Sequence, residues 1–289
     1  MTLISALLGL FIDRLLGNLH EYRRYRYFLA YVEWMRERLA ASVWDGTAGL
    51  LAILLPVLLV VALLQEWTAD LLFGLTGVAF HVVAFVYCLG PRDLAADVDT
   101  YCEVCGSSDD DLRRRAAERL LDGETPPDDA EAATSRVTRG VLVSASDRLF
   151  AVLLWFIVLG PVGAVLYRAV SVLYRERSSE DGFGDSVAML FAILVWIPAR
   201  LTALGYALSG HFDAALEGWR AAHGEQPRGA GGSERVLAET GLGALDVAIA
   251  DADAGACGRP VRAAMRLVWR TLVVWLVGLS MMTLAGWAG

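Results

Sequence analysis

The residues best suited to chemistry lie inside an apolar segment. The run 186–208 is long enough to cross a bilayer, yet it contains Pro198 and Arg200. At the rise of an α-helix, Arg200 falls close to the middle of a hydrocarbon core about 30 Å thick. A charge at that depth costs about 2.5–3.5 kcal/mol, so we expect the guanidinium to face protein, water or an anionic ligand.

A guanidinium in low-dielectric surroundings binds a carboxylate or a phosphate strongly, because its paired N–H groups match two oxygens. We therefore predict that Arg200 anchors an anionic small molecule. Pro198 could free a backbone carbonyl there, as broken helices do around membrane binding sites. The other candidate ligand-binding residues are Trp196, Tyr167, Arg168, Asp147, Asp13 and His211. The alternative is that Arg200 pairs with Asp13 or Asp147 purely for packing.

The composition indicates an integral membrane protein. Of 289 residues, 56% are hydrophobic and the mean hydropathy is +0.48, more than a soluble domain of this size normally carries. The net charge of −8 argues against a nucleic-acid partner, since no basic stripe is interleaved with exposed aromatic residues. All 25 basic residues are Arg, which excludes lysine Schiff-base chemistry and a Walker-type phosphate-binding lysine.

The apolar runs predict an all-α polytopic membrane protein with about four or five transmembrane helices, one of them broken at Pro198. The candidate spans are 47–64, 71–89, 149–170, 186–208 and 271–287. Gly160 and Pro161 interrupt the third. The opening residues are too few to span and suit an interfacial helix, and 20–40 has the Arg and aromatic content of an amphipathic helix on the headgroups or of a solvated connecting helix.

We expect six parts along the chain. These are interfacial and amphipathic helices in 1–46, a transmembrane hairpin in 47–90, a helical cytoplasmic region in 91–147, a transmembrane pair with the broken helix in 148–208, a cytoplasmic region in 209–267 and a C-terminal transmembrane helix in 268–289. Arginine-rich loops favour the cytoplasm, which places both large polar regions there. The arginines of 167–185 oppose this topology, and a re-entrant 186–208 would partly remove the objection.

Other polar residues give weaker signals. Cys102 and Cys105 form a CxxC without a second pair at zinc-finger spacing, so we predict two thiols, no metal and no cofactor. His81 suits a neutral imidazole bonded to a neighbouring helix. Asp147 and Arg148 suit an interfacial pair with a snorkelling arginine, or they line the same polar cavity as Arg200.

Three segments carry a family resemblance: WIPARLTALGYALSGHFDAALEGWR, RLFAVLLWFIVLGPVGAVLYRAVSVLY and the opening MTLISALLGLFIDRLLG. Together they resemble the AmpE family of inner-membrane proteins of Gram-negative bacteria. That family is similar in turn to the cobinamide-phosphate synthases, membrane enzymes that join an amino-alcohol to a corrinoid carboxylate. WIPARLT and LYRAV are the shared signatures. In the synthases LYRAV continues into Asn-Thr-Leu-Asp, whereas Ser171, Val172, Leu173 and Tyr174 stand here.

The AmpE resemblance implies a multi-pass modulator, in the bacterial inner membrane, of β-lactamase induction and peptidoglycan-recycling signalling, and hence of antibiotic resistance. Its anionic ligand would be a cell-wall fragment or a nucleotide, and a homo-oligomer is compatible with glycine-rich helix faces. The alternative is a membrane-bound amide-forming synthase of the cobinamide-phosphate type, which would use Mg²⁺. A second alternative is a muropeptide transporter. We expect a binding protein rather than an enzyme.

Overall fold

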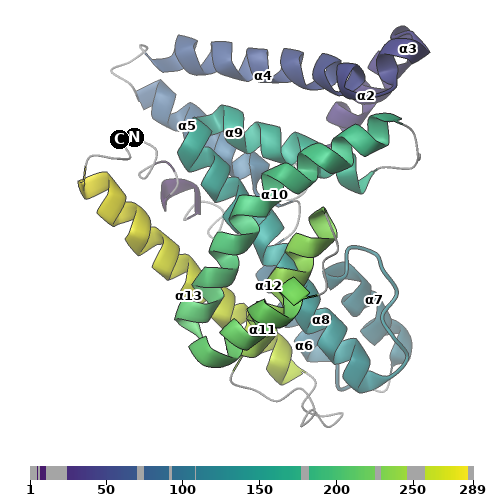
Figure 1. Cartoon of the computed structure of the whole chain (residues 1–289), viewed down its shortest axis with the longest axis vertical. Coiled ribbons are helices and arrows are strands. Elements are labelled where there is room, and N and C mark those ends of the chain that lie inside the picture. Colours follow the sequence, from purple (N-terminus) through teal and green to yellow (C-terminus); the bar gives the residue numbers. More distant parts are fainter. Residues whose placement is uncertain are drawn as a thin grey trace. The chain divides into compact units, whose positions relative to one another are not determined.

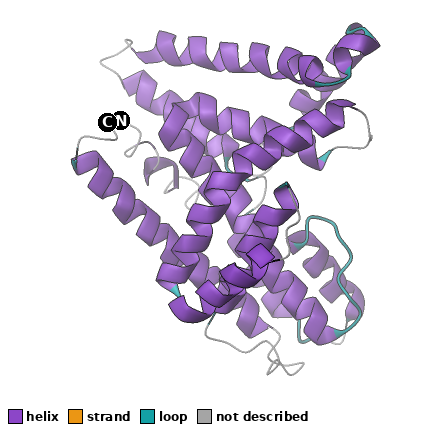
Figure 2. Ribbon diagram, in the orientation of Figure 1, coloured by secondary structure: helices purple, strands orange, loops and turns teal. Residues whose placement is uncertain are grey.

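The computed structural model describes residues 5, 7–10, 25–69, 75–90, 93–107, 109–176, 182–224, 229–245 and 258–285. Within these ranges the chain forms helices joined by turns and loops, without a β-strand (Figure 2). Four helical stretches are long and apolar enough to cross a membrane, and a fifth apolar helix is shorter. The prediction of an all-α polytopic membrane protein is therefore confirmed.

The membrane-length stretches are α4 (Thr47–Ala69), α10 (Gly182–Ser209), α13 (Gly258–Leu284) and the stretch Ala130–Arg175, which joins α8 (Ala130–Ala145), the π-helical turn η3 (Ser146–Phe150) and α9 (Ala151–Arg175). The shorter apolar helix is α5 (Leu75–Cys88). The remaining helices are α2 (Arg26–Arg38), α3 (Ala41–Trp44), α6 (Leu94–Val104), α7 (Asp110–Leu120), α11 (Phe212–Gly224) and α12 (Ala230–Ala244), and Figure 1 labels them along the chain.

The chain divides into two compact units. The first comprises Met1–Pro91, Ala151–Val195 and Leu279–Gly289, and the second comprises Arg92–Phe150 and Trp196–Gly278. In the first unit α5 packs against α9, where the fully buried rings of Phe85 and Phe156 have centroids 4.8 Å apart.

One membrane helix is broken, but not at the predicted place. Gly160 in α9 has φ 65° and ψ −155°, a conformation essentially restricted to glycine, and Pro161 follows it. In contrast, α10 runs without interruption through Pro198. The predicted break at Pro198 is therefore wrong. A glycine with positive φ interrupts a helix sharply, whereas a proline can be accommodated when another donor bonds the carbonyl oxygen that the proline leaves without a partner.

That donor is a tryptophan. Proline lacks an N–H group, so the carbonyl four residues earlier, that of Leu194, loses its helical partner. The indole N–H of Trp155 donates a hydrogen bond to the Leu194 carbonyl oxygen at 3.0 Å. The carbonyl that Pro198 frees is therefore occupied by a protein side chain.

In the second unit α11 and α12 form a tight antiparallel hairpin (Figure 1). A Cβ atom at Gly218 would overlap the carbonyl oxygen of Glu239, and one at Gly243 would overlap that of Ala214. The backbone N–H of His211 donates to the Ala244 carbonyl oxygen at 3.1 Å, which closes the open end of the hairpin. The two backbones thus lie at contact distance.

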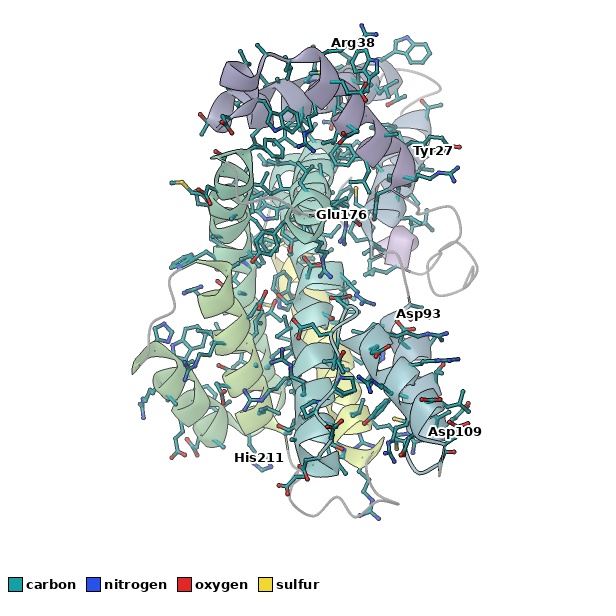
Figure 3. All side chains as sticks on the ribbon, turned by 90° about the vertical axis from the view of Figure 1, so that its right-hand side faces the viewer. Tyr27, Arg38, Asp93, Asp109, Glu176 and His211 are labelled. Carbon is teal, nitrogen blue, oxygen red and sulfur yellow. The ribbon has the colours of Figure 1, made fainter. Side chains whose placement is uncertain are left out.

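Aspartates occupy the N-cap positions of three polar helices. The carboxylates of Asp93, Asp109 and Asp129 accept hydrogen bonds from backbone N–H groups in the first turns of α6, α7 and α8. Figure 3 labels the first two of these caps.

Helix α2 buries none of its side chains. Its arginines lie over aromatic rings, with the Arg38 guanidinium carbon 4.4 Å from the Trp34 ring centroid. Tyr27 and Arg38, labelled in Figure 3, lie near its two ends. The helix therefore presents arginine and aromatic side chains on its surface.

Candidate functional site

Arg200 lies in the second unit and is held by three contacts. Its guanidinium carbon is 4.2 Å from the centroid of the Trp196 ring, one helical turn earlier. Its Nη1 donates to the Trp196 carbonyl oxygen at 3.1 Å and to the Ser233 hydroxyl oxygen at 3.3 Å. Ring stacking and two hydrogen bonds thus fix the plane of the guanidinium.

The alternative that Arg200 serves only as an ion-pair partner finds no support in the described part of the chain. There, no carboxylate oxygen lies within 4.0 Å of its guanidinium. Asp13, one of the two carboxylates considered for that pair, lies outside the described residues. Asp147 is buried at 6% exposure in the π-helical turn η3.

Sequence reasoning missed Ser233, which is 1% exposed and lies in the first turn of α12. It is 33 residues from Arg200 in the chain and directly follows the glycine-rich run 229–232. No periodicity or motif connects the two positions, so only the packing of α12 against α10 reveals the contact.

Tyr167 and Arg168 belong to the first unit and are buried there. The Arg168 side chain is buried, and its Nε donates to the Cys88 carbonyl oxygen at 2.7 Å, at the last residue of α5. A cation at a helix C-terminus satisfies a carbonyl that has no partner within the helix. Tyr167 is fully buried with its ring 6.3 Å from that of Phe191.

Arg148 is the centre of a partly buried charge cluster instead of snorkelling to an interface, since the side chain of Asp97 is 13% exposed and that of Asp122 is 39% exposed. Its Nη2 donates to Asp122 at 2.9 Å, and its Nη1 lies 3.6 Å from an oxygen of Asp97. Its side chain is 7% exposed. Asp122 has φ 53°, an uncommon conformation for a residue other than glycine. The cluster joins η3 to α6 and to the turn after α7.

The remaining histidine and cysteine predictions have mixed outcomes. His211 is exposed at the start of the α11–α12 hairpin, as Figure 3 shows. His81 Nδ1 lies 2.7 Å from the Gly77 carbonyl oxygen of its own helix, so this nitrogen does not make the predicted bond to a neighbouring helix. Cys102 is a free thiol, whereas Cys105 is disulfide-bonded, which corrects the prediction of two thiols.

The environment of Cys102 disfavours its thiolate. Burial raises the pKa of the thiol, and the nearby Arg262 guanidinium opposes that rise. The same physical effect raises the pKa of Tyr101, the preceding residue. In the part of the chain that the structure describes, no group of three or more His, Cys, Asp or Glu residues could hold a metal ion.

Comparison with known proteins identifies the family. The model of the CobD/Cbib protein family matches residues 6–253, which include both LYRAV and WIPARLT. The chain belongs to the CobD/Cbib family. The wider relationship predicted from these signatures is confirmed, whereas membership of the AmpE branch is not.

The chain resembles several CobD proteins along much of its length. It is 30% identical over 244 residues to the cobalamin biosynthesis protein CobD of Stutzerimonas stutzeri, covering 78% of each chain. It is 35% identical over 174 residues to that of Chromobacterium violaceum, covering 58% of this chain and 54% of the relative. A probable cobalamin biosynthesis protein CobD of Methanothermobacter thermautotrophicus is 28% identical over 206 residues, covering 68% and 66% respectively. No solved structure matches the chain.

These relatives overturn the predicted function. The CobD/Cbib match and the CobD relatives agree with the cobalamin alternative and not with an AmpE-like modulator of β-lactamase induction and peptidoglycan recycling. The prediction of a signalling protein is therefore wrong. It failed because WIPARLT and LYRAV occur in both families and cannot separate them.

Proposed function

We propose that this protein is a membrane-bound synthase of cobalamin biosynthesis that forms an amide between an amino-alcohol and a carboxylate of a corrinoid. The observation that carries the proposal is the CobD/Cbib match over residues 6–253. The relative from Stutzerimonas stutzeri, which aligns over 78% of both chains and is named a cobalamin biosynthesis protein, also supports the proposal.

The chemistry requires an activated carboxyl group. In the proposed reaction a corrinoid carboxylate oxygen first attacks the terminal phosphorus of a nucleoside triphosphate, which releases the diphosphate. The amine nitrogen then attacks the acyl carbon, the phosphate leaves with the bond electrons, and the nitrogen loses one proton to a base. The protein must hold two anionic substrates, and Arg200 is the cation we assign to that task because it lacks a carboxylate partner among the described residues.

One position departs from the synthase pattern. Tyr174 stands where the synthases carry the Asp of Asn-Thr-Leu-Asp, and its ring stacks on that of Phe191 with centroids 4.3 Å apart. The proton must therefore go to another acceptor, for which we propose the buried carboxylate of Asp147.

The proposal is tested with the purified protein in detergent, a corrinoid monocarboxylate, an amino-alcohol and a nucleoside triphosphate with Mg²⁺. Mass spectrometry should detect a product whose mass equals that of the two condensing substrates less one water. Absence of that product, from protein that still binds the corrinoid, would reject the synthase.

The stacked Tyr174 favours a second candidate function, corrinoid binding without synthesis. The two candidates separate in one comparison. If Tyr174→Asp gains amide-forming activity that the natural protein lacks, and Tyr174→Asn does not, the natural chain binds without synthesis. If the natural protein is already active, the second candidate is rejected.

We also propose that the protein resides in the bacterial inner membrane. Its four membrane-length helical stretches and its CobD relatives support a membrane protein. Fractionation of the host membranes on a density gradient tests the compartment, and recovery with the outer-membrane fraction would reject it.

A further inference from the structure

We infer that one face of α13 binds the headgroups of anionic phospholipids through a stripe of arginines. The arginine stripe consists of Arg259, Arg262, Arg266 and Arg270, and α13 is the yellow helix of Figure 1. All four residues belong to the second compact unit. Binding of a lipid does not require the synthase reaction, so the inference is independent of the proposed function.

The spacing of these arginines places them on one face of the helix. They follow one another at intervals of three or four residues, which is one helical turn, and they extend for about 17 Å along the helix axis. All four are exposed. The residues on the other face of this half of the helix, Val261, Ala264, Leu267 and Val268, are buried. The helix therefore has a buried apolar face and an exposed arginine face.

The position of α13 is fixed by residues outside the arginine stripe. The Thr271 hydroxyl donates a hydrogen bond to the Ser209 hydroxyl oxygen of α10 at 3.2 Å. The ring of Trp275 has its centroid 5.3 Å from that of Phe150. Because these contacts are made by the buried face, the arginine face remains exposed.

The charge of the stripe is not balanced within the described part of the chain. Helix α13 contains no acidic residue, and no carboxylate oxygen of the described residues lies within 4.0 Å of the four guanidinium groups. In contrast, the exposed Arg113 and Arg136 pair with Asp110 and Glu124. Arginines one turn apart repel one another, and Arg259 lies in the first turn, where the helix dipole disfavours a cation. An external anion relieves both effects.

The continuation of the same face points to a lipid as the source of that anion. Beyond Arg270 the exposed positions become apolar, since Val273 is 60% exposed and Val277 is 55% exposed. Trp269, 37% exposed, lies at the junction, as interfacial tryptophans of membrane helices do. Helix α13 is also one of the membrane-length helices. A phospholipid has a phosphate followed by acyl chains, so one molecule can contact both halves of this face.

The chemistry of arginine suits the phosphate of a headgroup. Its planar N–H groups bind two phosphate oxygens, and its long side chain reaches the headgroups from a position below them. A cluster of four or more basic residues beside a membrane helix is typical of sites for anionic lipids. A soluble polyanion can contact only the arginines, whereas an anionic phospholipid can occupy the whole face. The anionic phospholipid is therefore the partner that fits this surface.

Native mass spectrometry of the full chain in an uncharged detergent tests the surface. The protein is titrated with phosphatidylglycerol and, separately, with phosphatidylcholine of the same acyl chains. The natural protein should bind phosphatidylglycerol with a Kd at least about tenfold lower. Arg266→Gln should reduce this preference about fivefold, since one basic residue near a membrane contributes about that factor, and adding Arg270→Gln should remove most of the rest. Arg262 is left unchanged because it also lies beside the Cys102 thiol.

Two further variants separate the charge of the stripe from the total charge of the protein. Lysine at both positions, Arg266→Lys with Arg270→Lys, keeps the charge and should retain most of the preference. Arg220→Gln removes an exposed arginine of the polar helix α11, and this matched control should leave the preference unchanged. Circular dichroism and size-exclusion chromatography identify the variants that remain folded. Equal binding of the two lipids by the natural protein, or an unchanged preference in the folded double glutamine variant, overturns the inference.

Inorganic tripolyphosphate distinguishes a soluble polyanion from a lipid. Its Kd for the double glutamine variant should lie within about twofold of its Kd for the natural protein, because the stripe is assigned to headgroups. If the two substitutions weaken tripolyphosphate binding and leave the lipid preference unchanged, the surface serves a soluble polyanion and the inference is overturned.

Discussion

The indole N–H of Trp155 donates a hydrogen bond to the carbonyl oxygen of Leu194 at 3.0 Å. This bond replaces the helical hydrogen bond that Pro198, one turn later, cannot donate. Pro198 cannot donate to that carbonyl, and an unpaired carbonyl in an apolar layer costs several kcal/mol. One aromatic side chain on α9 thereby occupies the carbonyl oxygen that Pro198 leaves without its helical partner.

Replacing the indole should therefore destabilise the protein through this carbonyl. We expect Trp155→Phe to lower the free energy of unfolding by about 1–3 kcal/mol, because a buried acceptor loses its donor. Adding Pro198→Ala restores a backbone N–H and should recover part of that loss. Thermal unfolding in detergent measures both, with Trp67→Phe, at a residue 70% exposed, as the control. Strictly additive effects of the two substitutions would contradict the shared carbonyl.

A methyl group at the break in α9 should be poorly tolerated. Gly160 has φ 65° and ψ −155°, so Gly160→Ala should destabilise the protein by about 1–3 kcal/mol. Gly278 in α13 is helical with open space around its missing Cβ, and Gly278→Ala should stabilise the helix by about 0.5–1 kcal/mol. Opposite shifts of the melting temperature are the expected result, and equal shifts would argue against strain at Gly160.

The partly buried charge cluster around Arg148 should respond more than an exposed ion pair. Arg148→Met removes the cation that contacts Asp97 and Asp122, and because Asp122 is 39% exposed we expect a loss of about 3 kcal/mol at most, the lower end of the range for buried pairs. Arg136→Gln removes an exposed pair with Glu124 and should cost about 0–1 kcal/mol. Denaturant unfolding of both variants provides the comparison. Similar losses would mean that the cluster is more hydrated than its burial indicates.

Alkylation of Cys102 should require unusually high pH. Burial raises the pKa of its thiol, so the reactive thiolate forms later than in an unfolded chain. The stability that this burial contributes is complete below the unfolded pKa and is lost as the pH rises through the folded pKa. Iodoacetamide labelling followed at the Cys102 peptide by mass spectrometry measures the profile.

The neighbouring Arg262 provides a sharper test of the same environment. Its charge lowers the Cys102 pKa against the effect of burial, so Arg262→Gln should move the labelling profile to still higher pH. Arg266→Gln, at another exposed arginine of α13, is the control. A shift to lower pH in Arg262→Gln would show that burial and not charge controls access to the thiol.

Helices whose positions follow from a continuous run of apolar residues could be predicted from the sequence. The span 47–64 appears within α4, which begins at Thr47, the residue after Gly46 with φ 105°. Interactions across the chain could not be predicted. The continuity of α10 depends on Trp155, about 40 residues before Pro198, and the orientation of Arg200 depends on Ser233. Hydropathy and helical periodicity contain no information about such pairs.

The same limit explains the functional prediction. WIPARLT and LYRAV occur in both the AmpE family and the cobinamide-phosphate synthases. They therefore identified the wider group correctly, but they led to the wrong branch, AmpE. The family match over residues 6–253 covers the polar segments between the apolar helices as well as the two signatures.

The glycine contacts of the α11–α12 hairpin limit how this region can evolve. At Gly218 and Gly243 even one methyl group would overlap a carbonyl oxygen of the facing helix. An alanine at either position must therefore separate the two helix axes and shift α12, whose first turn contains Ser233. The two glycines therefore act as spacers that set the distance between Ser233 and the arginine it orients.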